Sequence, residues 1–251
     1  MTWAIISDTP SCMSRAQDLA KLLNLPILLP TDNQPDYILA VMSDHLEVQL
    51  KNTKPICVDF LTPQFIRRLH SVTVREPLLR AVGFKKNIPL TILDVTAGFG
   101  QDACILAYMG AQVILLEREP IMGVLLRDGL ARAQTQGELM SVAGRMHCEI
   151  TDAKDYLTAL TPEHYPDVIY LDPMFVHTKS ALPNKQMQFL QNLSNDSDAD
   201  QLLNLALERA GKRVVIKRSI NAPHLGGLKP DMCIKSKLLR FDVFIRLAST
   251  Q

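Results

Sequence analysis

The sequence predicts an α/β protein whose main part is a Rossmann-like, mostly parallel sheet with helices on both faces. Three observations support this fold class. From about residue 76 onward, short apolar runs alternate with segments of helical periodicity, as expected for a parallel sheet. A glycine-containing turn at residues 96–100 joins the first of these runs to a helix. The tail has two strand-like runs with no helix between them, which predicts an antiparallel pair at the C-terminal edge of the sheet.

Residues 1–75 are expected to form a small, separate α/β domain. Apolar residues recur at helical spacing between residues 13 and 23, and several short runs alternate apolar with polar residues. A second helix is expected to begin at Pro63, because proline is favoured in the first turn of a helix. The strands expected in this part are residues 3–6, 37–42, 46–51 and 56–60.

Residues 76–251 are expected to form the second, larger domain. Its predicted helices cover residues 103–109, 120–133 and 202–207. Its predicted strands are the run ending at residue 93, then 113–116, 148–151, 168–171 and 214–216, and the tail pair 232–239 and 241–247. In such a sheet a ligand binds beyond the carboxyl ends of the strands, where the strand order switches.

Composition limits the classes of function. Of the 251 residues 47% are hydrophobic and the net charge is +1, so no overall field attracts the chain to a polyanion. The five cysteines are widely separated, without a C-x-x-C pair, which favours a reducing compartment. No histidine and cysteine spacing indicates a metal site, and neither a signal peptide nor a membrane span is indicated. A cytoplasmic protein without a metal is therefore expected.

The glycine turn predicts a nucleotide-type cofactor. Gly98 and Gly100 let the backbone approach a ligand closely, and Glu117 ends the next strand, where an acid binds ribose hydroxyls. With Ala103, the two glycines also fit the dinucleotide pattern G-x-G-x-x-G/A, so an NAD-dependent dehydrogenase is a real alternative.

Two further acids favour S-adenosylmethionine over a dinucleotide. Asp94 stands before the glycine turn, where its carboxylate can hold the ammonium of the cofactor's amino-acid end. Asp152 follows the third strand, where it can reach the adenine amine. Asp94, Glu117, Asp152 and Asp172 all fall at the carboxyl ends of predicted strands, which would bring them to one edge of the sheet.

The segment Asp172-Pro173-Met174-Phe175 predicts chemistry on an amine-bearing ring. It follows a buried strand, so that Asp172 can accept a hydrogen bond from an exocyclic NH2 while Phe175 stacks on the base. Tyr170, two residues earlier, is interpreted as a core residue. Among the paired basic residues, Lys217 and Arg218 at the end of the fifth strand, with Arg67 and Arg68, are the candidate contacts to the phosphates of a nucleic acid, which the resemblance described next implies to be RNA.

A longer set of motifs resembles the ribosomal small-subunit methyltransferase J family. They are LDVTAGFGQDACILAYMGAQVILLEREP, LLRDGLARA, VIYLDPMF, KSAL, RVVIKR and RFDVFI, within residues 55–247. The resemblance implies the class I methyltransferase fold and transfer of a methyl group from S-adenosylmethionine to the exocyclic N2 of a guanine in 16S rRNA, as part of ribosome biogenesis. It also implies 16S rRNA or the small ribosomal subunit as partner. The cofactor contacts that it implies are Gln101, Asp102, Glu117, Arg118, Asp152, Ala153 and Asp172.

The sequence departs from the family in two places. Gln101 stands where the family usually has arginine, and residues 69–76 lack the glycines of the family's basic loop. Besides the dehydrogenase, two alternatives remain open at this stage: methylation of an amine in DNA or protein, and an RNA-binding module without catalytic activity.

Overall fold

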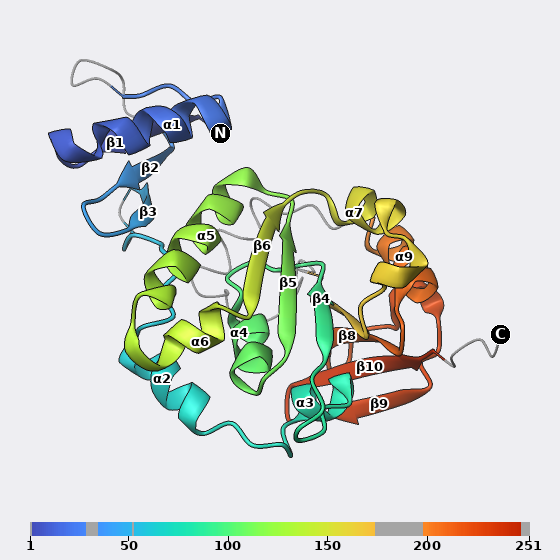
Figure 1. The fold of residues 1–251 in the computed structure, drawn as a ribbon. Helices are drawn as coiled ribbons and strands as arrows, with labels where there is room; N and C mark the ends of the chain where they lie inside the picture. Colours follow the sequence, from blue (N-terminus) through green and yellow to red (C-terminus); the bar gives the residue numbers. More distant parts are fainter. Residues whose placement is uncertain (1, 29–34, 52, 174–197, 247–251) are drawn as a thin grey trace.

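The computed structural model describes residues 2–28, 35–51, 53–173 and 198–246. Within these ranges lie a three-stranded and a seven-stranded sheet, with helices packed on them (Figure 1). The helices are α1 (Met13–Leu23), α2 (Pro63–His70), α3 (Pro77–Val82), α4 (Gln101–Tyr108), α5 (Pro120–Gln134), α6 (Met140–Ala143), α7 (Ala153–Ala159) and α9 (Ala199–Arg209). In this part of the chain no helix is both long enough and apolar enough to cross a membrane.

The N-terminal strands form the small sheet, in the order β1-β2-β3. β1 (Trp3–Ser7) pairs in parallel with β2 (Tyr37–Val41), and β2 pairs antiparallel with β3 (Leu46–Leu50). These strands, α1 and α2 confirm the sequence predictions. α2 begins as expected, with Pro63 in its first turn and the Thr62 hydroxyl accepting a hydrogen bond from the Phe65 amide.

The strand predicted at residues 56–60 is wrong. Only Ile56 forms a bridge, to Val48, and no ladder follows. Val58 and Phe60 are buried, each 2% exposed, in the core against the large sheet's helices. The carbonyl of Val58 accepts a hydrogen bond from the Arg132 side chain of α5 instead of from a neighbouring strand. Their alternating burial therefore comes from packing against a helix.

The large sheet has the strand order β6-β5-β4-β7-β8-β10-β9. Its strands are β4 (Thr91–Asp94), β5 (Gln112–Glu117), β6 (Met146–Ile150), β7 (Val168–Leu171), β8 (Arg213–Ser219), β9 (Met232–Lys235) and β10 (Leu239–Ile245). Strands β4 to β8 pair in parallel, whereas β10 pairs antiparallel with both β8 and β9. The order reverses at β4, which confirms the predicted Rossmann-like sheet with its antiparallel edge.

Successive residues of the central strands face opposite layers of helices. Val168, Tyr170 and Val215 belong to the core shared with α4 and α5, while Ile169 and Ile216 belong to the core shared with α7 and α9. Figure 1 shows these helices on the two sides of the sheet. This alternation determines which side chains of β7 and β8 can meet at the carboxyl edge.

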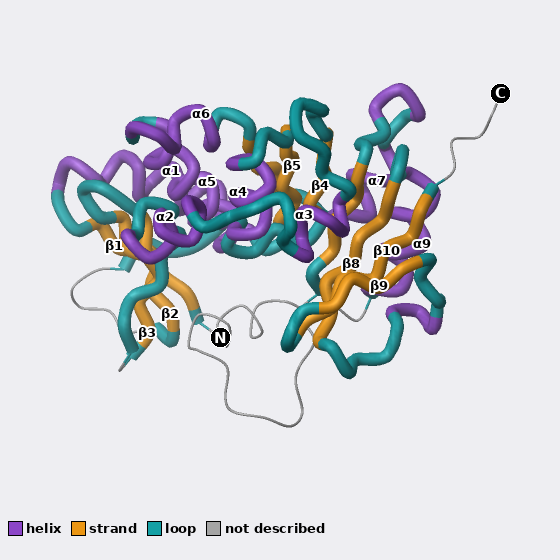
Figure 2. Tube along the Cα trace, turned by 90° about the horizontal axis from the view of Figure 1, so that it is seen from below, coloured by secondary structure: helices purple, strands orange, loops and turns teal. Residues whose placement is uncertain are grey.

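A buried carboxylate on α5 joins the N-terminal part to the large sheet. Asp128 is 5% exposed; it forms an ion pair with Arg15 at 2.6 Å and with Arg132 at 3.0 Å, and it accepts a hydrogen bond from the Leu46 amide at 3.0 Å. Gly129 lets the segment at Val58 pack closely against α5, because a Cβ at residue 129 would lie 2.7 Å from Val58. Figure 2 shows strands β1–β3 and β8–β10 at opposite ends of the molecule. The domain division near residue 75 stays a prediction.

Candidate active site

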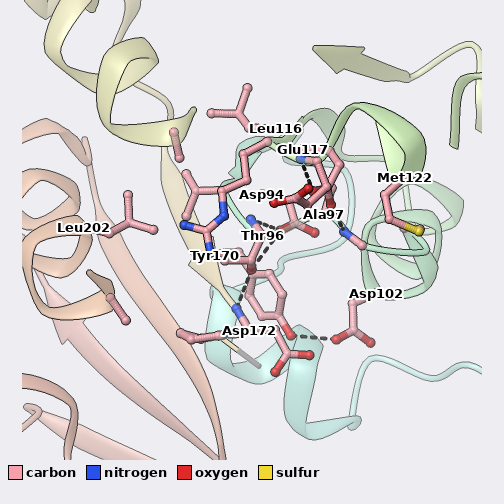
Figure 3. A pocket seen from close by; sticks show the side chains of 18 of the residues that line it. Asp94, Thr96, Ala97, Asp102, Leu116, Glu117, Met122, Tyr170, Asp172 and Leu202 are labelled. Carbon is pink, nitrogen blue, oxygen red and sulfur yellow. Dashed lines mark hydrogen bonds between the residues drawn. The ribbon is translucent and has the colours of Figure 1, made fainter. Parts of the chain in front are cut away.

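One pocket opens at the carboxyl edge of the central strands, and the four predicted acids line it. Figure 3 shows three of them, Asp94, Glu117 and Asp172. Asp94 ends β4, Glu117 ends β5, Asp152 follows β6 and Asp172 follows β7. The remaining candidate cofactor residues Gly98, Gly100, Gln101, Asp102, Arg118 and Ala153 also line it, as does Lys217. Apolar walls come from Leu116, Met122 and Leu202. Asp94 and Lys217 are 123 positions apart in the sequence, and the sheet topology brings both of them to the same cavity.

The turn after β4 depends on its glycines. Gly98 and Gly100 have φ values of 51° and 68°, in the left-handed region that side chains disfavour. A Cβ on Gly100 would also lie 2.8 Å from Leu126 of α5. The turn therefore presents its backbone to the pocket and leads directly into α4, which begins at Gln101.

Glu117 fixes this turn from the neighbouring strand. One of its carboxylate oxygens accepts a hydrogen bond from the Gly98 amide and the other from the Glu119 amide, both at 2.9 Å. The residue is only 8% exposed, and burial raises the pKa of its carboxyl group above the ordinary value. Each carboxylate oxygen has two acceptor sites, so Glu117 can still accept hydrogen bonds from ligand hydroxyls.

Asp94 lines the pocket and is only 2% exposed. It accepts a hydrogen bond from the Thr96 amide at 3.1 Å. Burial raises the pKa of Asp94 to about 8, and the nearby carboxylates of Asp102 and Asp172 add to this rise. A ligand cation beside Asp94 would favour its ionised form.

An ion-pair cluster at the start of α9 also lines the pocket. Asp198 pairs with Arg118 at 3.2 Å and with Lys154 at 2.5 Å, and all three line the pocket. Asp152 caps the N-terminus of α7 by accepting a hydrogen bond from the Lys154 amide at 2.8 Å. Ala153 is the first residue of that helix. Lys154 and Asp198 were not predicted as site residues.

Asp172 lies in a second ion-pair cluster, built by β7, β8 and α4. Lys217 donates to Asp172 at 2.9 Å and to Asp102 at 2.8 Å. The Tyr170 hydroxyl donates to the same oxygen of Asp102 at 2.6 Å (Figure 3). The Asp172 amide donates to the Thr96 hydroxyl at 2.6 Å, which links this strand end to the glycine turn.

Tyr170 is both a core and a site residue, so the interpretation as core alone is incomplete. The residue is 1% exposed in the sheet's main core, yet it also lines the pocket and its hydroxyl donates to Asp102. The signal in the sequence was its position, two residues before Asp172, which places both side chains on the same face of the strand.

The basic candidates are not brought together. Arg218 points to the opposite face of β8 from Lys217; it is 5% exposed and donates to the Pro223 carbonyl at 2.7 Å. A phosphate contact would require the Arg218 side chain to leave this position. Arg67 and Arg68 are exposed on α2, and Arg68 pairs with Glu76 at 2.5 Å.

Phe175 lies outside the described residues. In the ranges that are described, no group of three or more His, Cys, Asp or Glu side chains is arranged to hold a metal ion.

Comparisons with known proteins identify the family. A family model described as "Putative SAM-dependent methyltransferase" matches residues 19–246. Proteins named ribosomal RNA small subunit methyltransferase J are similar to this chain over nearly its whole length. The one from Nitrosococcus oceani is 40% identical, covering 96% of this chain and 97% of its own length. The chain belongs to this methyltransferase J family. The Thioalkalivibrio sulfidiphilus member is 43% identical over 92% of both chains.

A solved structure agrees with the family assignment. The SAM-dependent methyltransferase from Neisseria gonorrhoeae superposes with a TM-score of 0.75 at 27% identity, covering 97% of this chain and 96% of its own. This chain is thus an S-adenosylmethionine-dependent methyltransferase, which excludes the dehydrogenase and the non-catalytic alternatives.

The pocket fits S-adenosylmethionine. Its left-handed glycine turn presents backbone to a ligand, and a buried carboxylate, Glu117, lies behind that turn. A second buried carboxylate, Asp94, faces the part of the pocket beside Asp102 and Asp172. Apolar side chains of Leu116 and Met122 complete a cavity suited to a purine ring.

The buried Asp94 predicts a pH-dependent stability difference. We expect the Asp94→Asn variant of the ligand-free enzyme to gain stability over the wild type as the pH rises from about 4 to 8. The unfolded chain loses the Asp94 proton near its ordinary pKa of 3.8, whereas the folded chain keeps it until about pH 8. Raising the pH in this window therefore favours unfolding of the wild type, by up to about 1.4 kcal/mol per pH unit.

Urea denaturation of both proteins at pH 5, 6, 7 and 8 measures this difference. Titrating groups that do not interact with Asp94 contribute equally to both proteins, so the difference between the two free energies of unfolding reports Asp94 with its neighbours Asp102, Asp172 and Lys217. A difference that stays constant over this range would show that Asp94 is ionised in the folded, ligand-free protein.

Proposed function

We propose that this enzyme methylates the exocyclic N2 of a guanine in 16S rRNA, within the naked RNA or the small ribosomal subunit, in the cytoplasm. The names of its relatives support an rRNA substrate. The observation that carries the proposal is the position of Asp172. Its carboxylate is held by Lys217 at the carboxyl edge of β7, in the same pocket as the glycine turn and Glu117.

The side chains around the pocket have separable roles in holding the cofactor. We assign Glu117 to the ribose hydroxyls, Asp94 to the ammonium of the amino-acid end, and Asp152 with Ala153 to the adenine. Gln101, Asp102 and Arg118 complete the contacts. When bound, S-adenosylmethionine supplies a methyl group that is attached to a positively charged sulfur. On transfer of the methyl group, this sulfur becomes a neutral thioether, which makes it a good leaving group.

Asp172 prepares the nucleophile. The lone pair of guanine N2 is delocalised into the ring, which makes it a poor nucleophile. A hydrogen bond from N2–H to the Asp172 carboxylate localises that pair and orients the amine toward the methyl donor. Once N2 carries the methyl group it becomes acidic, and its proton passes to Asp172 or to water, so a strong base is not required. We retain the assignment of Phe175 to stacking on the extruded base.

Mass mapping of 16S rRNA tests the proposal. Digested rRNA from cells with and without this protein is compared by mass spectrometry, and the expected difference is one guanine that carries a methyl group only when the protein is present. The purified enzyme should restore that methyl group with S-adenosylmethionine, to naked rRNA or to small subunits. If no guanine differs, the substrate is another amine.

Arg67 on α2 is expected to contribute to RNA affinity through phosphate. Log affinity falls as log salt rises, because each neutralised phosphate releases counterions when the RNA binds. Arg67→Ala should make this negative slope less steep by about 1. Arg68→Ala is the matched comparison, and a smaller change is expected because Arg68 must first give up Glu76, its ion-pair partner at 2.5 Å. Filter binding of 16S rRNA between 50 and 300 mM salt measures both slopes. An unchanged slope for Arg67→Ala would remove α2 from the RNA interface.

A further inference from the structure

Lys217 is the only described lysine that touches Asp172, and its surroundings do not suit a phosphate. Its ammonium lies between the carboxylates of Asp102 and Asp172, at 2.8 and 2.9 Å. Among the described residues, this ammonium and the two carboxylates that it contacts have a formal charge of −1, which disfavours a phosphate beside them. Burial alone would lower the pKa of Lys217, but the two carboxylates outweigh it and hold the pKa above its ordinary value. The side chain is therefore a permanent hydrogen-bond donor.

The cluster is nevertheless accessible to a ligand. The side chains of Lys217, Asp102 and Asp172 are 22%, 25% and 40% exposed, and all of them line the pocket. An ammonium has three N–H donors, and in the described part of the chain Asp102 and Asp172 accept two of them. A carboxylate has about four acceptor sites, so Asp172 can accept hydrogen bonds from a ligand while it also accepts the one from Lys217.

Lys217 and Asp172 together present a donor beside two acceptor oxygens. The Watson–Crick edge of guanine has the complementary order: the O6 acceptor, the N1–H donor and the N2 amino donor. Adenine has an amine where guanine has O6 and lacks the donor at N1. Cytosine likewise has an amine in that place, with acceptors at N3 and O2. Either base would place N–H groups against the Lys217 ammonium and ring lone pairs against Asp172.

We propose that Lys217 is a specificity-determining residue, which donates a hydrogen bond to O6 of the target base while Asp172 accepts from N1–H and N2–H. The inference rests on the proposed function, because it concerns the same site and the same guanine. Tyr170 and Asp102 support it by fixing Lys217: the tyrosine hydroxyl donates to the Asp102 oxygen that accepts from the ammonium. The site then selects guanine by its edge as well as by its amine.

Base analogues test the proposal. The substrate is a synthetic RNA with the mapped target guanine, or the same RNA with 2-aminopurine there, which keeps the 2-amino group but lacks O6 and N1–H. For each enzyme the ratio of kcat/KM for guanine to that for 2-aminopurine is measured. Lys217→Met should reduce this ratio by about 10- to 100-fold, because only guanine loses a hydrogen bond from a charged donor. Lys217→Arg keeps a donor and should retain most of the ratio.

Lys154→Met is the matched control, since Lys154 also lines the pocket and also pairs with an aspartate, Asp198. Its ratio should equal that of the wild type. An unchanged ratio in an active Lys217→Met variant would overturn the inference.

If that variant is inactive, wild-type enzyme is assayed on RNA with 6-thioguanine, which retains N1–H and the amine but has a weak acceptor at position 6. A rate about 10-fold or more below that of guanine is expected, and an equal rate would overturn the inference. Wild-type enzyme that methylates no guanine would instead defeat the proposed function.

Discussion

Asp172→Ala is expected to lower kcat by at least about 100-fold, measured with cofactor and RNA both saturating, while RNA affinity changes little. The variant removes the acceptor that orients N2 toward the methyl donor, and loss of such positioning typically costs two or more powers of ten in rate. The local backbone should persist, because the link from residue 172 to Thr96 is made by the main-chain amide. Single-turnover methylation of 16S rRNA measures the effect.

Asp172→Asn separates charge from shape in the same position. It keeps one acceptor oxygen. It loses the ion pair with Lys217, whose ammonium lies 2.9 Å from the Asp172 carboxylate in the wild-type enzyme. We expect its kcat to fall between those of the wild type and the alanine variant. The affinity for S-adenosylmethionine must be measured in both variants, since Asp172 also lines the cofactor pocket. Robust turnover by Asp172→Ala at saturation would move the amine acceptor to another group.

The large sheet could be predicted because its strands are short apolar runs with helices between them. The run at residues 168–171 coincides with β7, since a strand covered on both faces has apolar side chains in both directions. The same argument failed at residues 56–60. Alternating burial there arises against α5, and a pattern of side chains cannot tell a strand from an extended segment packed on a helix.

Short helices were the other omission. α3 and α7 contain 6 and 7 residues, fewer than two full turns of clear periodicity. Asp152 was interpreted as an acid after a strand, and it is also the N-cap that begins α7. A capping residue and a ligand-binding residue can thus be the same side chain, and the sequence pattern alone indicates only one of these roles.

The carboxylates of the site were predictable, whereas their partners were not. Acids that follow parallel strands must meet at one edge, whatever the strand order. The contact of Lys217 with Asp172 requires more, namely that β8 lies beside β7 and that both side chains face α4. Parity along β8 would have separated Lys217 from Arg218, because neighbouring residues of a strand point to opposite faces. The prediction that both residues contact phosphate did not use this alternation, and it stays a prediction.

Glu117→Ala is expected to weaken S-adenosylmethionine binding by about 1.5–3 kcal/mol, the usual loss for a charge-assisted acceptor. The structure adds a complication, because Glu117 also accepts hydrogen bonds from the Gly98 and Glu119 amides, so the variant loosens the turn as well.

Calorimetric titration therefore compares S-adenosylhomocysteine with its 2′-deoxy and 3′-deoxy analogues. If Glu117 binds the ribose, a deoxy ligand should bind wild-type enzyme more weakly than the parent ligand, and the alanine variant should bind both nearly equally. Thermal unfolding establishes that the variant is folded. An unchanged affinity in a folded Glu117→Ala protein, or an equal deoxy penalty in both proteins, would remove Glu117 from the ribose and leave it as a support of the glycine turn.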